Sequence, residues 1–248
     1  MKRKITYSVL VVCLLSIVFF SCKKKEYTKI FYGYDYFPNN VGHYIIYECD
    51  SMVYLGSGFG KITYRYQIKE VIDSLYNNNQ GQPTQRVVRY KRTSDTIPWS
   101  NILVPEKVWT ATLLSSMAIR QEDNYQYVKL VFPASLNETW NGNNLNTLGA
   151  QNYEYTALNT PYDLTTINTK QNIHFDSTLT VLEIKDSSFL NYGYYFEQYA
   201  AGIGMIHRIV NVDTSSIFPP PGYSTPDTSL STTRGVWYTE TYLSSGNQ

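Results

Sequence analysis

The chain has few of the features that mark catalysis or a special class of partner. Its 21 basic and 20 acidic side chains nearly balance, and neither sign clusters in the body of the chain, which excludes an obvious nucleic-acid surface. The three histidines include no pair at the short spacing of a zinc site, and no Gly-x-Ser-x-Gly elbow is present. We therefore expect no enzyme activity, no metal, no cofactor and no nucleic-acid partner.

A long apolar run is also missing. The main apolar stretch, residues 9–20, is shorter than the roughly 20 residues that a membrane-spanning helix needs. Basic residues 2–4 precede it, and it ends at Ser21 and Cys22. A basic start, a short apolar centre and a small residue at the end are typical of an export signal. We therefore predict a signal peptide over residues 1–21.

The end of this signal resembles the lipobox of bacterial lipoproteins, in which the signal is cut just before a cysteine that receives acyl chains. By that resemblance Cys22 is the lipidation site, residues 22–33 are a lipidated N-terminus and polar tether, and residues 34–248 are a β domain. Two or more acyl chains give stable membrane attachment. The alternatives are an ordinary cleaved signal, with Cys22 as a bystander, and an uncleaved signal anchor.

The residues after Cys22 indicate where such an anchor would lie. Lys23 is not the aspartate that resembles an inner-membrane retention signal, and the following run lacks the paired acids of some surface-export signals. The resemblance therefore implies attachment to the outer membrane, facing the periplasm. The lysines at 23–25 either attract anionic head groups or form a solvated spacer.

Cysteine is too scarce for a disulfide framework. Cys13 would leave with the signal and Cys22 would be acylated, so Cys49 would remain alone in the mature chain. The fold must then depend on packing. We expect Cys49 to be a buried small hydrophobic residue and not a nucleophile.

Tyrosine is abundant, with 24 of the 248 residues, and together with many Thr, Val and Ile residues it favours strands over helices. The clearest strand is 61–76, where Ile62, Tyr64, Tyr66 and Ile68 alternate with polar residues. Further strands are predicted at 43–54, 85–94, 124–132, 172–184, 192–200, 203–213 and 234–243. Loops are predicted at 56–60, 77–83, 137–150 and 218–226.

The segment 106–120 is ambiguous, because Pro105 and an apolar spacing of three to four residues also fit a helix. We favour a strand, since Val108 to Thr112 lacks good helix formers. The regular spacing of strands and turns predicts an antiparallel meander. The fold class is therefore all-β, with a single antiparallel sheet that is strongly curved or forms an incomplete barrel.

Short motifs in the domain resemble those of uncharacterised cell-envelope lipoproteins of Bacteroidota-type bacteria. They are the aromatic-Phe-Pro at 36–38, the Val-Gly at 41–42 with its following strand, and the segments 130–133, 140–143 and 199–206. His43 and Ile45 depart from that pattern, where another polar residue and Trp are usual. The resemblance implies a tethered β domain and supplies no catalytic residues.

A few residues are candidates for contact or modification. Trp140, in an Asn-rich segment, is a possible ligand contact of the carbohydrate type, and the alternative is an indole that pins a loop to the sheet. Ser51, Ser74 and Thr96 lie in Asp-Ser/Thr-apolar triplets that resemble O-glycosylation sites in exported proteins of the same bacteria. The sequence gives no reason to pair particular carboxylates, such as Glu183 and Glu197, for glycoside hydrolysis.

The function expected from the sequence is that of a membrane-anchored cell-envelope lipoprotein with a non-catalytic structural or binding role and an unknown ligand or envelope partner. One alternative is a carrier of a lipid or other hydrophobic ligand in a half-barrel, which requires a deep apolar pocket. The second alternative is an envelope glycan hydrolase, which requires two acids that face each other in an open cleft.

Overall fold

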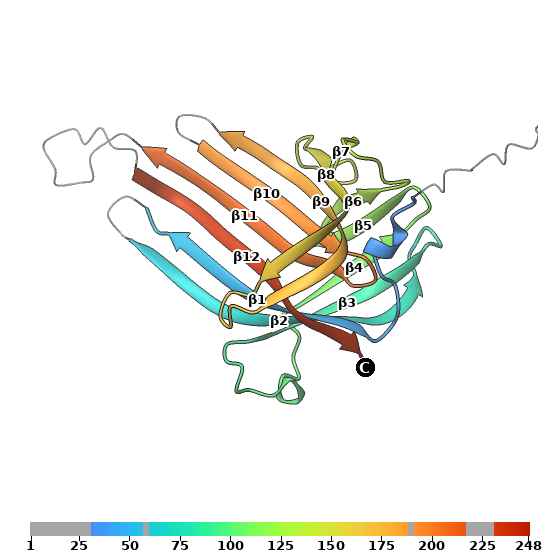
Figure 1. Ribbon diagram of the computed structural model, residues 1–248, viewed down its shortest axis with the longest axis horizontal. Helices are drawn as coiled ribbons and strands as arrows, with labels where there is room; N and C mark the ends of the chain where they lie inside the picture. Colours follow the sequence, from blue (N-terminus) through green and yellow to red (C-terminus); the bar gives the residue numbers. More distant parts are fainter. Residues whose placement is uncertain (1–30, 57–59, 188–190, 217–230) are drawn as a thin grey trace, which may run out of the picture. The chain divides into compact units, whose positions relative to one another are not determined.

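The computed structural model of the chain contains one antiparallel sheet of twelve strands (Figure 1). It describes residues 31–56, 60–187, 191–216 and 231–248. The predicted signal, Cys22, most of the tether, residues 57–59 and the Pro-rich loop at 218–226 lie outside the described residues. The strands are β1 (His43–Tyr54), β2 (Lys61–Asn77), β3 (Pro83–Arg92), β4 (Lys107–Leu113), β5 (Met117–Glu122), β6 (Tyr125–Val131), β7 (Thr139–Asn141), β8 (Asn152–Thr165), β9 (Asn172–Ser187), β10 (Asn191–Ala200), β11 (Gly204–Ser216) and β12 (Ser231–Asn247).

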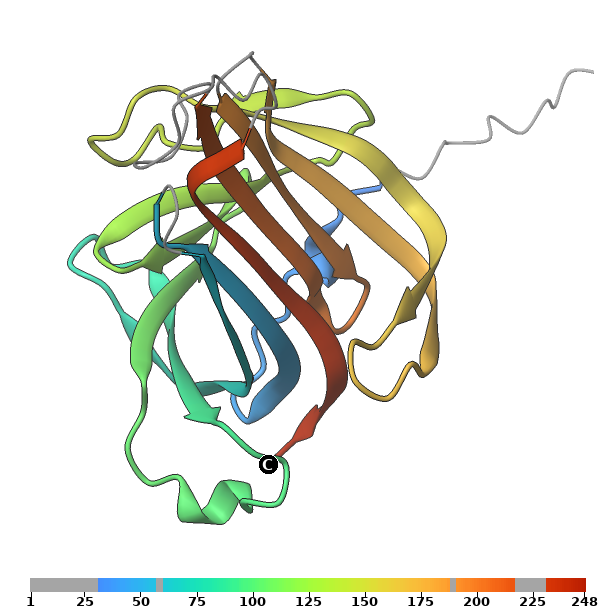
Figure 2. The ribbon, with the colours of Figure 1, turned by 90° about the vertical axis from the view of Figure 1, so that its left-hand side faces the viewer.

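The sheet curves into a nearly closed barrel. Its strand order is β6-β5-β4-β3-β2-β1-β12-β11-β10-β9-β8-β7, so each strand pairs with its neighbours in the chain except at one place. The first and last strands pair with each other, and the seam lies between β6 and β7. Figure 2 shows the two halves of the sheet, blue-to-green and yellow-to-red, curving around a common interior. The predicted all-β, antiparallel, incomplete barrel is confirmed.

A few hydrogen bonds connect the two sides of the seam, in place of the regular backbone hydrogen bonds between paired strands. The backbone N–H of Val128 on β6 donates to the carbonyl of Gly142 at 2.9 Å, and the Trp140 indole Nε1 donates to the carbonyl of Val128 at 2.8 Å. The Tyr155 hydroxyl donates to the Val131 carbonyl and accepts from the Val131 N–H, both at 2.8 Å. These contacts satisfy part of the free edge of β6, which would otherwise be open to pairing with another chain.

The segment before β1, residues 32–38, closes one end of the barrel, and we call it the plug. Its centre is the 3₁₀ turn η1 (Tyr34–Tyr36), in which Tyr36 is fully buried. The Tyr34 hydroxyl donates to the carbonyl of Ser115 in the β4–β5 turn at 2.8 Å. The carbonyl of Asp35 accepts from the N–H of Gly202 in the β10–β11 turn at 2.8 Å. The plug therefore joins the two halves of the sheet.

All the predicted strands are confirmed to within a few residues at each end, and the bounds of β1 match those predicted. The ambiguous segment 106–120 contains strands β4 and β5, and a second 3₁₀ turn, η2 (Trp99–Asn101), precedes it. No strand is predicted from the sequence at β8, and the short β7 lies inside the predicted loop 137–150. None of the helical turns in the described residues is long and apolar enough to cross a membrane.

The inner face of the barrel follows the period-two pattern of the sequence. In β2, Ile68 is buried, and Tyr66 and Ile62 lie on the same face of the strand. Cys49, opposite Tyr66, is 2% exposed, as expected, and burial raises the pKa of its thiol. The pattern continues past Ile68 to Glu70, so that a charged side chain follows the apolar ones into the interior.

Gly142 tests the packing of the seam. A Cβ at this position would lie 2.3 Å from the ring of Tyr153, so the ring or the seam must shift. We expect Gly142→Ala to lower the free energy of unfolding by about 1–3 kcal/mol, the usual cost of overpacking. Gly149→Ala, which places its Cβ in open space, is the matched control. Equal urea midpoints for the two variants would contradict this account of the seam.

Candidate functional site

Among the residues whose side chains the structure describes, nine charged side chains lie inside the barrel and form one network. None of them is more than 14% exposed, and each takes part in at least one ion pair. Burying so many charges is unfavourable unless each is paired and hydrogen-bonded. The nine residues are Glu70, Arg89, Arg120, Glu122, Lys129, Glu183, Glu197, Arg208 and Glu240.

Six of these residues form a closed circuit of alternating charge, which we call the ionic ring. The ring connects β2, β3 and β5 of the first half of the sheet to β11 and β12 of the second half. Arg208 is the main link, with Nη2 at 3.0 Å from Glu122 Oε2 and Nη1 at 3.9 Å from Glu240 Oε2. In order around the circuit the members are Arg208, Glu122, Arg120, Glu70, Arg89 and Glu240.

The other three charges extend from the ring across the seam. Arg208 Nε lies 3.1 Å from Glu197 Oε1 on β10. Lys129 on β6 places its Nζ 2.8 Å from carboxylate oxygens of both Glu197 and Glu183, which come from β10 and β9. The Tyr199 hydroxyl donates to Glu197 at 2.5 Å. The seam is thus closed from the inside by a buried lysine.

The buried network has one carboxylate in excess, because it contains four cations and five acids. Glu183 ends the chain of pairs, and burial, with the nearby charge of Glu197, raises its pKa to about 7. Burial acts in the same direction on Glu122, but Arg208 and Lys129 outweigh it, so the pKa of Glu122 is lowered. Glu183 is therefore the member of the network that gains a proton first as the pH falls.

Glu183 and Glu197, for which the sequence gave no reason to expect a pairing, do meet in the structure. Lys129 lies between them and bonds to both, and the three side chains are 2–7% exposed. This arrangement differs from a pair of hydrolytic acids, which needs room for a sugar and a water between the two carboxyl groups.

A polar cavity of about 310 Å³, which we call the mouth pocket, opens on the side of the ionic ring away from the plug. Glu122 and two guanidinium groups of the ring form its floor. Aromatic and aliphatic side chains form its walls, and four exposed charged side chains form its rim. The lining residues are Arg89, Glu122 and Arg208 at the floor, Tyr66, Ile68, Trp109, Val210 and Tyr238 on the walls, and Lys91, Glu106, Lys107 and Asp123 at the rim.

The walls and the charges of the mouth pocket are in direct contact. The Arg89 guanidinium lies 4.0 Å from the centre of the Trp109 ring, a cation–π geometry. The Trp109 indole Nε1 donates to Asp123 at 3.3 Å, and Lys107 pairs with the same carboxylate at 2.5 Å. These contacts fix the orientation of Trp109 before any ligand enters.

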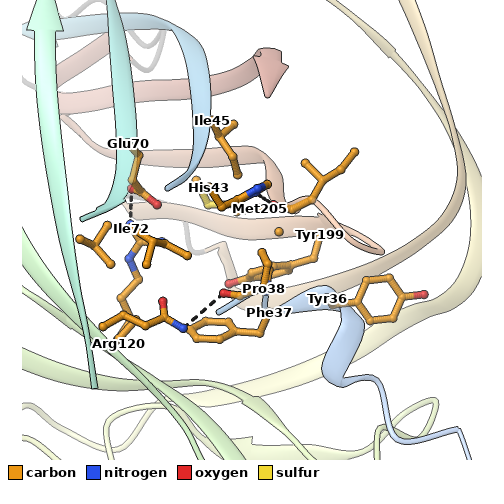
Figure 3. A pocket seen from close by; sticks show the side chains of 15 residues that line it. Tyr36, Phe37, Pro38, His43, Ile45, Glu70, Ile72, Arg120, Tyr199 and Met205 are labelled. Carbon is orange, nitrogen blue, oxygen red and sulfur yellow. Dashed lines mark hydrogen bonds and ion pairs between the residues drawn. The ribbon is translucent and has the colours of Figure 1, made fainter. Parts of the chain in front are cut away.

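The cavity at the plugged end is different in size and lining (Figure 3). It has a volume of about 40 Å³ and lies between the plug residues Tyr36, Phe37 and Pro38 and the inner face of the barrel, including Ile45 and Met205. A typical organic ligand needs about 300 Å³ or more. The plugged end is therefore filled by the protein itself.

An outer groove of about 410 Å³ runs between two loops on the outside of the sheet. Two of its charged groups already hold those loops. Glu48 accepts hydrogen bonds from the N–H groups of Ile167 and Asn168, and Arg92 donates to the carbonyl of Ile97 in the β3–β4 loop. The mouth pocket is the better candidate site, because its rim charges are exposed and its walls are aromatic.

Of the candidates from the sequence, Trp140, Ser74 and Thr96 do not line the mouth pocket, whereas Ser51 pairs with Tyr238 of the pocket wall. Trp140 is half-buried at the seam, with its ring 4.6 Å from that of Tyr155. Ser51 is half-buried on β1, Ser74 is half-buried on β2 and donates to Asp73, and Thr96 is exposed in the β3–β4 loop. The rim and floor of the pocket were not predicted. The sequence pattern that could have indicated the floor residues is a charged residue in phase with the apolar face of a strand.

Comparison with known proteins adds no assignment. No protein-family model matches the chain, and no curated protein is significantly similar to it.

The pKa of Glu183 predicts how stability varies with pH. The folded protein holds this proton up to about pH 7, whereas the unfolded chain releases it near pH 4.5. Ionisation of Glu183 therefore removes stability as the pH rises from 4.5 to 7, by up to about 3 kcal/mol. In Glu183→Gln this fall should be absent, and it should persist in the control Glu106→Gln, which alters an exposed carboxylate. Urea unfolding between pH 4.5 and 8 measures the effect, and identical profiles for the two variants would contradict it.

Proposed function

We propose that the protein is a lipoprotein of the bacterial cell envelope, anchored through Cys22 to the outer membrane on its periplasmic side, with a non-catalytic binding role. The signal pattern and the resemblance to envelope lipoproteins support the anchor. The mouth pocket supports the binding role, because it is a preformed cavity of suitable size with aromatic walls and a few oriented polar groups.

The observation that carries the non-catalytic role is the pairing of every charged group in the mouth pocket. Arg208 pairs with Glu122 on the floor, and Lys107 pairs with Asp123 on the rim. A general acid or base needs a group free to exchange a proton near the working pH. Glu183 has a pKa in that range, but it is buried against Lys129 and does not line the pocket. The pocket residues are thus suited to binding.

A carrier of a hydrophobic ligand is the first alternative, and the described residues favour it less. The apolar cavity at the plug has about 40 Å³, and the larger mouth pocket would place charged groups against an apolar molecule. A glycan hydrolase is the second alternative. Its support would be the Glu183–Glu197 pair, whose space is occupied by Lys129.

Cys22→Ser tests the anchor. We expect radiolabelled palmitate to enter the wild-type protein and the control variant Cys13→Ser, and to be absent from Cys22→Ser, which should move from the membrane to the soluble fraction. The reason is that acyl chains supply about 0.8 kcal/mol of membrane affinity for each buried CH₂. Labelling or membrane fractionation that does not change in Cys22→Ser would refute the anchor.

Val210→Trp tests the binding role. Val210 lines the mouth pocket outside the ionic network, so an indole there fills the cavity while leaving the ion pairs in place. Native mass spectrometry of the protein purified from its own host should detect a retained small molecule on the wild type and not on Val210→Trp. Asn211→Trp places the same group on the opposite face of β11 and should retain it. Equal retention by the two variants would place the ligand elsewhere.

A further inference from the structure

The barrel is longer on one side than on the other, and this difference leaves part of its inner face open. β2 pairs with β3 only from Gln67 onwards, so Lys61 to Tyr66 extend beyond β3. In the same region β2 pairs with β1, and β1 pairs with β12 as far as Tyr54. Figure 1 shows these long strands running past the shorter strands β3–β6. The inner face of these long strands therefore extends beyond the mouth pocket, where β3 no longer faces it and it is open to solvent.

This open inner face, which we call the trough, is lined by aliphatic and tyrosine side chains. Tyr66 and Tyr238 line the mouth pocket, so residues two positions further along the same strands share their face. Tyr64 is 50% exposed, Val236 41% and Ile62 39%. Val53 pairs with both Ile62 and Val236, Val236 pairs with Val212, and Tyr195 pairs with the pocket residue Val210. The trough residues are Val53, Ile62, Tyr64, Tyr195, Val212 and Val236.

The charges next to the trough discriminate between classes of ligand. An apolar ligand would cover the rim charges without hydrogen-bonding to them, which is unfavourable. An anion would approach Glu106, Glu122 and Asp123, whereas a cation would approach the lysines and arginines of the same pocket. A hydroxyl group both donates and accepts, so it suits a site in which the two signs alternate.

The rim has bonding capacity left for such hydroxyl groups. Lys91 Nζ and Glu106 Oε1 are 3.8 Å apart, which is an ion pair but longer than a hydrogen bond. Both side chains are more than a third exposed, so a hydroxyl between them can accept from the lysine and donate to the carboxylate. On the neighbouring walls, Tyr66 and Tyr238 present rings that are apolar on their faces and polar at their hydroxyls.

We propose that the mouth pocket and the trough together bind an uncharged oligosaccharide. The C–H faces of successive sugar rings pack on Tyr64 and on the face of Tyr66 opposite Lys91, whose Nζ lies 4.3 Å from the centre of the Tyr66 ring. The sugar hydroxyls bond to the paired charges at Lys91, Glu106 and Arg208. The seven residues from Ile62 to Ile68 span about 20 Å along β2, which exceeds the length of one sugar ring. This inference rests on the proposed binding role and names its ligand class.

The test uses the acylated full chain in lipid nanodiscs, with empty nanodiscs as the blank, and isothermal titration calorimetry. The probes are maltohexaose, cellohexaose, xylohexaose and mannohexaose as uncharged glycans, trigalacturonic acid as an acidic glycan, and oleate as an amphiphile. The variants are Tyr64→Ala in the trough, Val210→Trp in the pocket, and the control Tyr192→Ala. Tyr192 is 39% exposed and lies on the outer face of the same long strands.

We expect at least one uncharged hexasaccharide to bind, with affinity at least tenfold weaker in Tyr64→Ala and Val210→Trp and unchanged in Tyr192→Ala. If only trigalacturonic acid or oleate binds, and Val210→Trp abolishes that binding, the proposed ligand class is wrong and the binding role stands. Uncharged-glycan binding that all variants share would overturn the site. Absence of binding by every probe, with no molecule retained from the host, would overturn both proposals.

Discussion

The ionic ring is the interaction on which the rest of the structure depends. Desolvating its three arginines and three glutamates costs several kcal/mol per ion, which is offset only when each group meets its partners in good geometry. The members come from five strands, and a shift of any strand by one residue would turn its charged side chain to the outside of the barrel. The ring therefore couples strand register, closure of the barrel and the floor of the mouth pocket.

The same coupling gives the barrel two unlike ends. The plug seals the end where the chain enters, with Tyr36 fully buried, and the pocket opens at the other end of the same strands. The ring lies between them, so a ligand bound at the mouth would contact groups whose positions are already fixed by pairing. Such preorganisation lowers the entropy lost on binding. In the proposed binding role, stability and recognition would use the same side chains.

The strands could be predicted from the sequence because their signal is local. Ile62, Tyr64, Tyr66 and Ile68 alternate clearly, whereas β8 was missed because Asn159 has positive φ and the register with β9 shifts three times. Closure through β1 and β12, and the meeting of Arg208 with Glu122, depend on pairs far apart in the sequence. A residue such as Glu70, charged yet in phase with an apolar face, was the available sign of a polar interior.

The pairing of β1 with β12 also constrains the order in which the barrel can assemble. The two strands are about 200 residues apart, so a chain that is synthesised from its N-terminus presents β1 long before its partner emerges. Until then the edge of β1 that pairs with β12 is open. The members of the ionic ring on β2, β3 and β5 also lack their partners Arg208 and Glu240. An exposed strand edge and an incomplete polar core favour association with other chains. The chain must therefore pass through a vulnerable half-barrel before β12 is available, and a chaperone would protect it most at that stage.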